Sequence, residues 1–246
     1  MLWGQKKDKP KSKLEQLRDD ARECLKREGY SRLFEPLVGD ELPPNFLDLA
    51  LLRTAVLNAE PSLVLEYGSG YSTYVLAKTL QSVGKGRLVS IELGDEWRKI
   101  SAGHIPADLA DRVDFIVPQP SIRLALLQLP AVNTSLWFEK KSKSPRRVGI
   151  ATISFPEIYD LAPDIIFIDG PDARQIPGYL DSATQEMLPA VVSDPLVFLS
   201  KAKPIICVDG RREQCAILSA NLPPDYKTVI HEEQRFTFFY PPGARH

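Results

Sequence analysis

Glycine, hydroxyl and acidic residues crowd the segment EYGSGYST, and their types suit the binding of a small ligand. Gly68 and Gly70 stand where an apolar run changes to a helical pattern. Glycine at such a point permits a turn with positive φ and lets a ligand approach the backbone. Ser72 and Thr73 suit the N-cap of the next helix, whose free N–H groups can hold an anion. An ordinary strand-to-helix turn also uses glycine, so the pattern indicates a site without identifying its ligand.

Two glutamates flank the glycine turn. Glu66 lies two residues before Gly68, and Glu92 ends the next apolar run, 24 residues after Gly68. A carboxylate at the end of a second strand suits a ribose, because it accepts hydrogen bonds from both hydroxyls of the diol. Enzymes that use NAD and enzymes that use S-adenosylmethionine share this feature, so Glu92 does not separate the two classes.

Glu66 and Thr73 distinguish between these two cofactors. A dinucleotide site requires the pattern G-x-G-x-x-G/A, and Thr73 stands here at the sixth position. A pyrophosphate on this turn would also face Glu66, which costs roughly a few kcal/mol at an effective dielectric constant of about 20. S-adenosylmethionine brings an ammonium and a sulfonium, which Glu66 can attract while the helix N-terminus takes the carboxylate. The electrostatics therefore favour the sulfonium cofactor.

Charged side chains follow the later apolar runs, at the ends where ligands bind in open α/β sheets. They are Asp169, Asp172 and Arg174, then Asp209, Arg211 and Arg212, and finally His231, Glu232 and Glu233. Methyl transfer to oxygen or nitrogen needs an oriented acceptor and a base. Asp169 and His231 are the candidate catalytic bases. The alternatives are that Asp169 caps its own turn and that His231 is a surface turn residue.

The elements that position these residues alternate along the chain. Five apolar runs without alternation predict parallel strands covered on both faces, at 63–67, 87–92, 112–117, 164–169 and 204–209. Helices are predicted between them at 72–82, 95–111 and 210–221. Only four residues separate the last two runs, 226–230 and 235–240, which therefore form a hairpin. The fold class is α/β: a doubly wound, seven-stranded, mostly parallel sheet with an antiparallel last strand.

Two further regions complete the predicted organisation. Residues 1–44 form a basic, helical N-terminal extension, with a helix at 11–29, and residues 45–246 form one domain that opens with a helix at 45–59. Residues 118–162 are an insertion that carries the basic segment 139–147. Residues 171–203 are helical pieces interrupted by prolines.

With these elements in place, the sequence resembles the class I S-adenosylmethionine-dependent methyltransferases, which have a Rossmann-like fold. The resemblance rests on E-x-G-x-G (Glu66, Gly68, Gly70), on Glu92 and on seven strands ending in a hairpin, and it covers about residues 45–240. It implies S-adenosylmethionine as the cofactor, with its methionine half on the glycine turn and its ribose on Glu92.

The residues implied for the cofactor are Glu66, Gly68, Ser69, Gly70, Ser72, Thr73, Glu92 and Gln119. Gln119 follows the third strand, where members of the family contact adenine. The sequence departs from the family there, because VPQPS replaces the usual Gly-Asp-Ala type sequence. Ser72 also replaces the third glycine of the fuller motif.

The segment FIDG resembles the fourth-strand acid of the catechol-type O-methyltransferases, which hold Mg²⁺ with this acid and an Asp-Asn pair on the next strand. Asp169 and Asp209 match in position, but Gly210 follows Asp209 and no Asn completes the set. Oxygen coordination needs several ligands. No metal is therefore expected.

Three alternatives stay open at the level of the sequence. The first is a methyltransferase-like module that binds or interacts without turnover. The second is an NAD-dependent oxidoreductase, which Glu66 and Thr73 disfavour. The third is a nucleic-acid methyltransferase, which requires the segment 139–147 and the basic N-terminus to form one patch.

Composition excludes several other classes. The chain has 31 Lys and Arg against 32 Asp and Glu, so it is not a polycation for nucleic acid. No apolar run reaches the ~18–20 residues of a membrane span. The basic residues 1–13 precede no apolar region, so they do not form a secretory signal. Three cysteines without metal spacing favour a reduced, cytoplasmic protein. A small molecule is the expected substrate.

Overall fold

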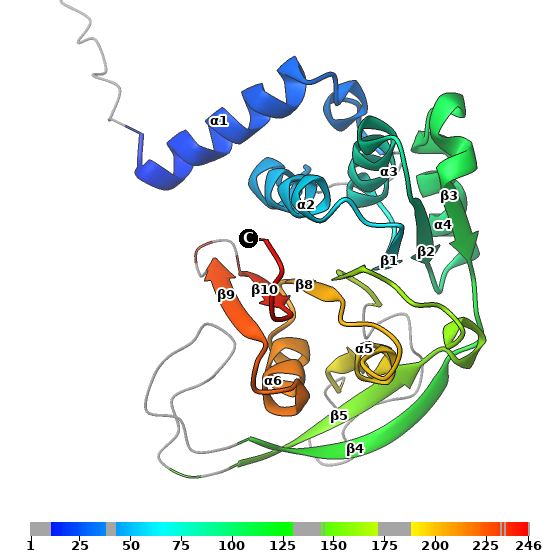
Figure 1. The fold of residues 1–246 in the computed structure, drawn as a ribbon, viewed down its shortest axis with the longest axis vertical. Helices are drawn as coiled ribbons and strands as arrows, with labels where there is room; N and C mark the ends of the chain where they lie inside the picture. Colours follow the sequence, from blue (N-terminus) through cyan, green and yellow to red (C-terminus); the bar gives the residue numbers. More distant parts are fainter. Residues whose placement is uncertain are drawn as a thin grey trace, which may run out of the picture.

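The computed structural model describes residues 11–37, 43–129, 144, 146–171, 188–231, 233 and 235–245 (Figure 1). Several sequence predictions fall outside these residues. They are the segment 1–10, most of the basic segment 139–147, residues 172–187 of the second long connection, and the rim residues Asp172, Arg174 and Glu232.

Seven strands form the main sheet, as the sequence predicts. They are β1 (Leu63–Tyr67), β2 (Arg87–Ile91), β3 (Val113–Ile116), β6 (Ile165–Ile168), β8 (Ile205–Asp209), β9 (Lys227–His231) and β10 (Phe236–Tyr240). Their spatial order is β3-β2-β1-β6-β8-β10-β9, and β10 runs antiparallel to both its neighbours. All residues of β1, β6 and β10 are buried, as expected for a sheet covered on both faces. The doubly wound fold is confirmed.

Helices cover the two faces of the main sheet (Figure 1). They are α1 (Lys13–Arg27), α2 (Phe46–Ala59), α3 (Tyr71–Val83), α4 (Asp95–His104), α5 (Asp194–Phe198) and α6 (Arg212–Asn221), with 3₁₀ helices η1 (Ser31–Phe34), η2 (Ala107–Arg112) and η3 (Pro156–Ile158). On one face, Leu52 of α2 and Leu76 of α3 pack around Val64. On the other, Phe198 of α5 and Leu218 of α6 belong to the core around Leu65 and its neighbours.

The single helix predicted at 95–111 is two elements, α4 and η2. The break falls at Ile105, whose backbone is extended (φ −82°, ψ 121°), and at Pro106, which precedes η2. A residue before proline is disfavoured in the helical region, and proline has no N–H to donate. The helical periodicity of the sequence continues across this point, so the sequence analysis did not recognise that the helix ends before Pro106.

The two long connections form a second, three-stranded sheet that the sequence analysis did not predict. It consists of β4 (Ser121–Leu129), β5 (Arg146–Ser154) and β7 (Ala190–Val192), in the order β4-β5-β7. The insertion predicted at 118–162 supplies an antiparallel pair, and the stretch predicted as helical pieces supplies β7. β7 has only three residues and pairs with a segment that is distant in the sequence, so no local sequence pattern predicts it.

Buried polar side chains join the two sheets. Asp194 of α5 accepts hydrogen bonds from the hydroxyl of Tyr67 (3.1 Å) and from the backbone N–H of Phe155 (3.0 Å). Gln214 of α6 accepts from the N–H of Val192 (2.6 Å) and donates to its carbonyl (2.9 Å). The Gln214 amide thus pairs with the edge of β7 as another strand would.

The N-terminal helix packs on the α2 and α3 side of the sheet. Ser12 and Glu15 form a capping box at the start of α1. Leu25 and Leu33 are buried beside Tyr74 of α3, so this segment continues the core. The proposed boundary at residue 44 stays a prediction. None of the helices in the described part of the chain is long and apolar enough to cross a bilayer.

Candidate functional site

The glycine turn after β1 meets the loop after β6. Gly68 has φ +87°, and a Cβ atom there would lie 2.7 Å from the backbone N of Gly170. A Cβ on Gly170 would in turn lie 2.6 Å from Cα of Gly68. Only glycine allows both the conformation and this approach. β1 and β6 are neighbours whose connections run to opposite sides of the sheet, and such a switch point is where open α/β sheets bind ligands.

Glu66 lies behind the turn and orients it. The side chain is fully buried, and its Oε2 accepts from Thr73 Oγ1 (2.7 Å) and Ser90 Oγ (2.6 Å). Thr73 Oγ1 accepts in turn from the backbone N–H of Gly70 (2.9 Å). Burial raises the pKa of Glu66 to about 7, against the lowering effect of its hydroxyl donors. Glu66 therefore acts on the turn through Thr73.

Glu92 is held by donors from the protein. Its Oε1 accepts from the backbone N–H groups of Leu93 (2.8 Å) and Gly94 (3.2 Å). Its Oε2 accepts from Ser69, through the backbone N–H (3.1 Å) and the hydroxyl (3.3 Å). The side chain is only 4% exposed. A carboxylate has about four acceptor positions, so the described structure fills those of Glu92.

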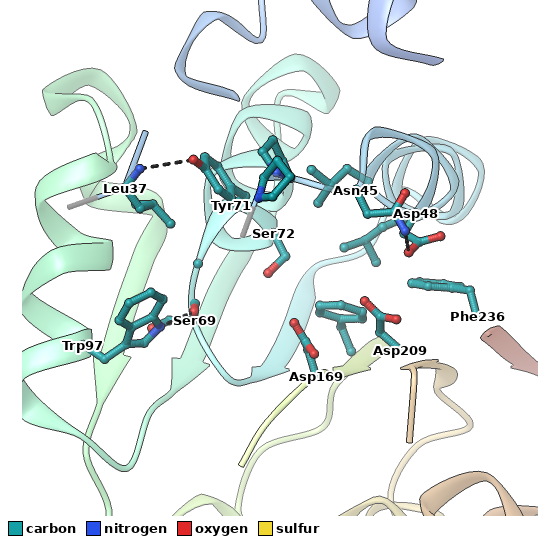
Figure 2. A pocket seen from close by; sticks show the side chains of 16 residues that line it. Leu37, Asn45, Asp48, Ser69, Tyr71, Ser72, Trp97, Asp169, Asp209 and Phe236 are labelled. Carbon is teal, nitrogen blue, oxygen red and sulfur yellow. Dashed lines mark hydrogen bonds between the residues drawn. The ribbon is translucent and has the colours of Figure 1, made fainter. Parts of the chain in front are cut away.

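A pocket of about 350 Å³ opens beside the turn (Figure 2). It is lined by Leu37, Pro43, Pro44, Asn45, Asp48, Leu49, Leu52, Ser69, Gly70, Tyr71, Ser72, Trp97, Phe167, Asp169, Asp209 and Phe236. These residues come from α2 and the segment before it, from the turn and the start of α3, from α4, from the carboxyl ends of β6 and β8 and from the start of β10. The volume falls within the range of about 300–1,000 Å³ typical of small-molecule sites.

Three carboxylates face this pocket (Figure 2). Burial raises the pKa of Asp48 to about 7, with Arg18 opposing and Asp169 adding to the rise. Burial raises the pKa of Asp209 to about 8, reinforced by the charges of Asp169 and Asp48. Asp169 opens into the pocket, yet the surrounding protein also raises its pKa. The pocket is an acidic site that a cation would stabilise.

Arg211 supplies the positive charge beside the acids. Its guanidinium donates to the backbone carbonyls of Pro171 (2.7 Å) and Asp169. It lowers the pKa values of Asp169 and Asp209, but burial outweighs it at both. Arg211 therefore fixes the loop after β6 and compensates the acidic charge only in part.

The start of α3 lines the side of the pocket that suits an anion, in contrast to the acidic side. Ser69, Gly70 and Ser72 line it, and the 13-residue helix α3 begins at Tyr71. A Cβ atom on Gly70 would meet nothing within 4 Å, so this glycine leaves open space beside the turn. Trp97 Nε1 donates to the carbonyl of Ser69 (2.7 Å) and holds the turn. The helix N-terminus can receive an anionic group here.

The structure brings together part of the predicted site. Ser69, Gly70, Ser72 and Asp169 line the pocket, whereas Gly68, Glu66, Thr73 and Glu92 support it from behind or beside the turn. Gln119 is exposed after β3, and its backbone N–H donates to Glu157 (3.3 Å). His231 ends β9 on the row Asp209–Phe236–His231, but it does not line the pocket. The roles of Gln119 and His231 stay predictions.

Asp48 and Phe236 are among the lining residues that the sequence analysis did not predict. Asp48 lies in an apolar helix, FLDLALL, and is 4% exposed. A lone acid at a buried position of such a helix was the available signal, since buried acids need a partner or a function. Phe236 opens the last strand and is fully buried at the pocket wall. Nothing in the sequence distinguishes it from the other aromatic residues of that strand.

The described ranges contain no group of three His, Cys, Asp or Glu side chains arranged to hold a metal ion.

No family model matches the chain, and no curated protein matches it. Among solved structures, the chain is similar to an O-methyltransferase from Bacillus cereus in complex with SAH, at 18% identity, 94% and 92% coverage of the two chains and a TM-score of 0.45. It is also similar to the SAH-bound methyltransferase PaMTH1 of Podospora anserina, at 13% identity, 95% and 98% coverage and a TM-score of 0.48. At these identities and TM-scores, the likenesses do not establish a family.

Proposed function

We propose that the pocket binds S-adenosylmethionine and that the protein transfers its methyl group to a small molecule. The observation that carries the proposal is the union of a helix N-terminus and three carboxylates in one pocket. The methionine carboxylate suits the start of α3 at Tyr71 and Ser72, which line the pocket and whose backbone N–H groups belong to the first turn of the helix. The N–H groups of Ser69 and Gly70 already donate to Glu92 and Thr73. The ammonium and the sulfonium suit the acidic side.

The same charges disfavour a dinucleotide. A pyrophosphate at the start of α3 would share the pocket with Asp169 and two further carboxylates. Two like charges a few Å apart repel by roughly a few kcal/mol at an effective dielectric constant near 20. A ligand with positive groups next to its single carboxylate fits the pocket, whereas a doubly anionic ligand does not.

Glu92 and Gln119 are proposed for the adenosine half of the cofactor. Glu92 lies beside the turn, as a ribose acceptor should, but its acceptor positions are filled by Ser69, Leu93 and Gly94. A ribose hydroxyl must therefore replace one of these donors. The Ser69 hydroxyl is the best candidate to move, because its 3.3 Å contact is the longest of the four. Gln119 is proposed for adenine on its position after β3.

The chemistry needs little from the protein besides position and a base. When bound, the cofactor supplies an electrophilic methyl group on sulfonium. Asp169 lies between the start of α3 and the acids of α2 and β8 (Figure 2), where it can orient the acceptor or take its proton. We also propose a cytoplasmic location, which the three free cysteines in the described chain support.

Ligand-induced thermal stabilisation tests the proposal. We expect 1 mM S-adenosylmethionine or SAH to raise the unfolding temperature by several degrees, and NAD⁺ or NADH to leave it unchanged. The variant Gly70→Ala places a methyl group in the open space beside the turn and should lose most of the shift. Gly103→Ala is the matched control, because a Cβ on this exposed helical residue also meets no atom. Absence of any shift with SAH at 1 mM would refute the proposal.

A further inference from the structure

The acidic pocket holds one carboxylate oxygen that has no explanation within the protein. Asp48 is 4% exposed, and its Oδ2 accepts from the side-chain amide of Asn45. Its Oδ1 is buried and has no hydrogen-bond partner in the part of the chain that the structure describes. An unpaired buried carboxylate oxygen is costly. Because Asp48 lines the pocket, a ligand entering there can supply the missing donor.

Asp48 and Asp209 share one end of the pocket with Phe236 (Figure 2). Phe236 and Asp209 are register partners on adjacent strands. The rings of Phe167 and Phe236 stack at 6.0 Å, and both line the pocket. Trp97 and Ser69 mark the other end, next to the helix N-terminus (Figure 2). The pocket therefore has an acidic, aromatic end beyond the part assigned to the cofactor.

The acids of the pocket favour the entry of a cation. The pocket has three carboxylates, Asp48, Asp169 and Asp209. The pKa values of Asp48 and Asp209 are raised although Arg18 acts on the first and Arg211 on the second, so a cation that enters beside them would stabilise their ionised forms. Aromatic walls beside carboxylates suit an ammonium ion, through ion pairing and cation–π attraction.

We propose that the methyl acceptor is a cationic amine with an apolar body, whose ammonium is held by Asp48 and Asp209 and whose nitrogen is methylated. This inference rests on the proposed function and names its substrate class. Asp48 supplies the fixed ion-pair partner, because Asn45 already orients its carboxylate. Leu49, Leu52 and the two phenylalanines supply the apolar wall.

A carboxylate must also remove a proton, because an ammonium nitrogen has no lone pair. Asp209, which faces the ammonium at this end of the pocket, takes one proton from it, and Asp169 is left to orient the acceptor. The neutral amine keeps the electron pair. The nitrogen then forms a bond to the methyl carbon while the carbon–sulfur bond breaks and its electrons stay on sulfur. The products are the N-methylammonium, the thioether SAH and a protonated Asp209, which returns its proton to solvent. Because burial raises the pKa of Asp209 to about 8, its carboxylate is a stronger base than an ordinary aspartate.

Calorimetry on the SAH-saturated protein tests the inference. The probes are ethylamine, benzylamine and 2-phenylethylamine, each compared with the alcohol of the same skeleton. We expect at least one amine to bind tenfold or more tightly than its alcohol. Asp48→Asn should reduce that affinity at least tenfold, measured at an SAH concentration that saturates the variant as well, so that a change in SAH affinity does not enter the comparison. Asp225→Asn, which removes an exposed carboxylate outside the pocket, is the matched control.

The outcomes separate the two proposals. If SAH binds but no amine is preferred over its alcohol, or if Asp48→Asn binds the amine as the wild type does, the substrate class is overturned and the cofactor stands. If SAH does not bind, both are overturned.

A product assay tests the site of methylation. The preferred amine with labelled S-adenosylmethionine should yield the N-methylated product by mass spectrometry, at a rate reduced at least 100-fold in Asp209→Asn. An O-methylated product from an amino alcohol would contradict methylation at nitrogen.

Discussion

Gly68 and Gly70 stand two residues apart in one turn, yet they have different tasks. Gly68 has a left-handed φ of +87° and touches Gly170, whereas Gly70 has an extended φ of 165° and an unfilled Cβ direction. The first glycine is required by the fold, and the second by the space beside the turn. A G-x-G pattern in a sequence does not reveal this difference.

The two alanine variants should separate folding from binding. Gly68→Ala should lower the free energy of unfolding by about 3 kcal/mol, because a left-handed alanine and a clash with Gly170 add together. Gly70→Ala should change it by less than about 1 kcal/mol and weaken SAH binding at least tenfold. Urea denaturation and calorimetry measure the two effects. Equal losses of stability would contradict the assignment.

Sequence reasoning identified the residues of the turn better than those of the acidic side. Glu66, Gly68 and Thr73 belong to one short segment, so their proximity follows from the chain itself. Asp48 joins Asp169 and Asp209 only after α2 packs on the sheet face next to β6 and β8. That meeting depends on tertiary packing, which spacing along the chain does not encode. Only the composition of α2, with one acid among apolar residues, hinted at it.

Among the elements, strands with long apolar runs were predicted well, and short or distant ones were not. β1 and β6 are buried along their whole length, and such runs are visible in a single sequence. The second sheet depends on the pairing of β5 with β7, which has only three residues. Gln214 and Asp194, which accept hydrogen bonds from Val192 and Phe155, also lie far from β5 in the sequence.

The hydrogen bonds between Gln214 and Val192 should contribute strongly to the free energy of unfolding. Gln214→Leu keeps the approximate side-chain volume but leaves the N–H and carbonyl of Val192 without their partner. Buried unpaired polar groups cost about 1–3 kcal/mol each, so we expect a loss of about 3 kcal/mol in the free energy of unfolding. Hydrogen exchange should also show faster exchange at the Val192 amide.

A second glutamine provides the control for this experiment. Gln81 donates to Asp108 on a partly exposed surface of α3. Gln81→Leu should cost less than about 1 kcal/mol, because water can replace its contact. If Gln214→Leu costs no more than Gln81→Leu, the side-chain pairing does not hold β7.

Several acidic side chains of the molecule are buried, and this should make its free energy of unfolding depend on pH. Burial raises the pKa of Glu66 and Asp48 to about 7 and that of Asp194 to about 6. A carboxyl group with a raised pKa favours the folded state when protonated. Its contribution is therefore full below the pKa of the unfolded chain, near 4, and is lost as the pH rises through the folded value.

We accordingly expect the ligand-free protein to be more stable at pH 5 than at pH 8. Glu66 alone accounts for on the order of 3 kcal/mol, since each pKa unit is worth about 1.4 kcal/mol. The variant Glu66→Gln should reduce the difference in unfolding free energy between the two pH values by a similar amount. Denaturation by urea at both pH values measures it. A wild-type stability that increases from pH 5 to pH 8 would contradict the burial of these charges.

The topology places the acidic pocket where the chain changes direction across the sheet. β1 and β6 meet at the switch point, α3 begins there, and β8 ends at Asp209, which lines the same pocket. The order of the strands thus converts four separate segments into one site. Fold and site lead to the same central claim, that this pocket receives a sulfonium cofactor.

A crystal structure of the protein with SAH tests that claim most directly. We predict that the methionine carboxylate lies against the backbone N–H groups of Tyr71 and Ser72 at the start of α3, beside Gly70. The sulfur should face the end of the pocket that Asp48 and Asp209 line. A structure with SAH bound elsewhere, or one in which millimolar SAH leaves this pocket empty, would contradict the account.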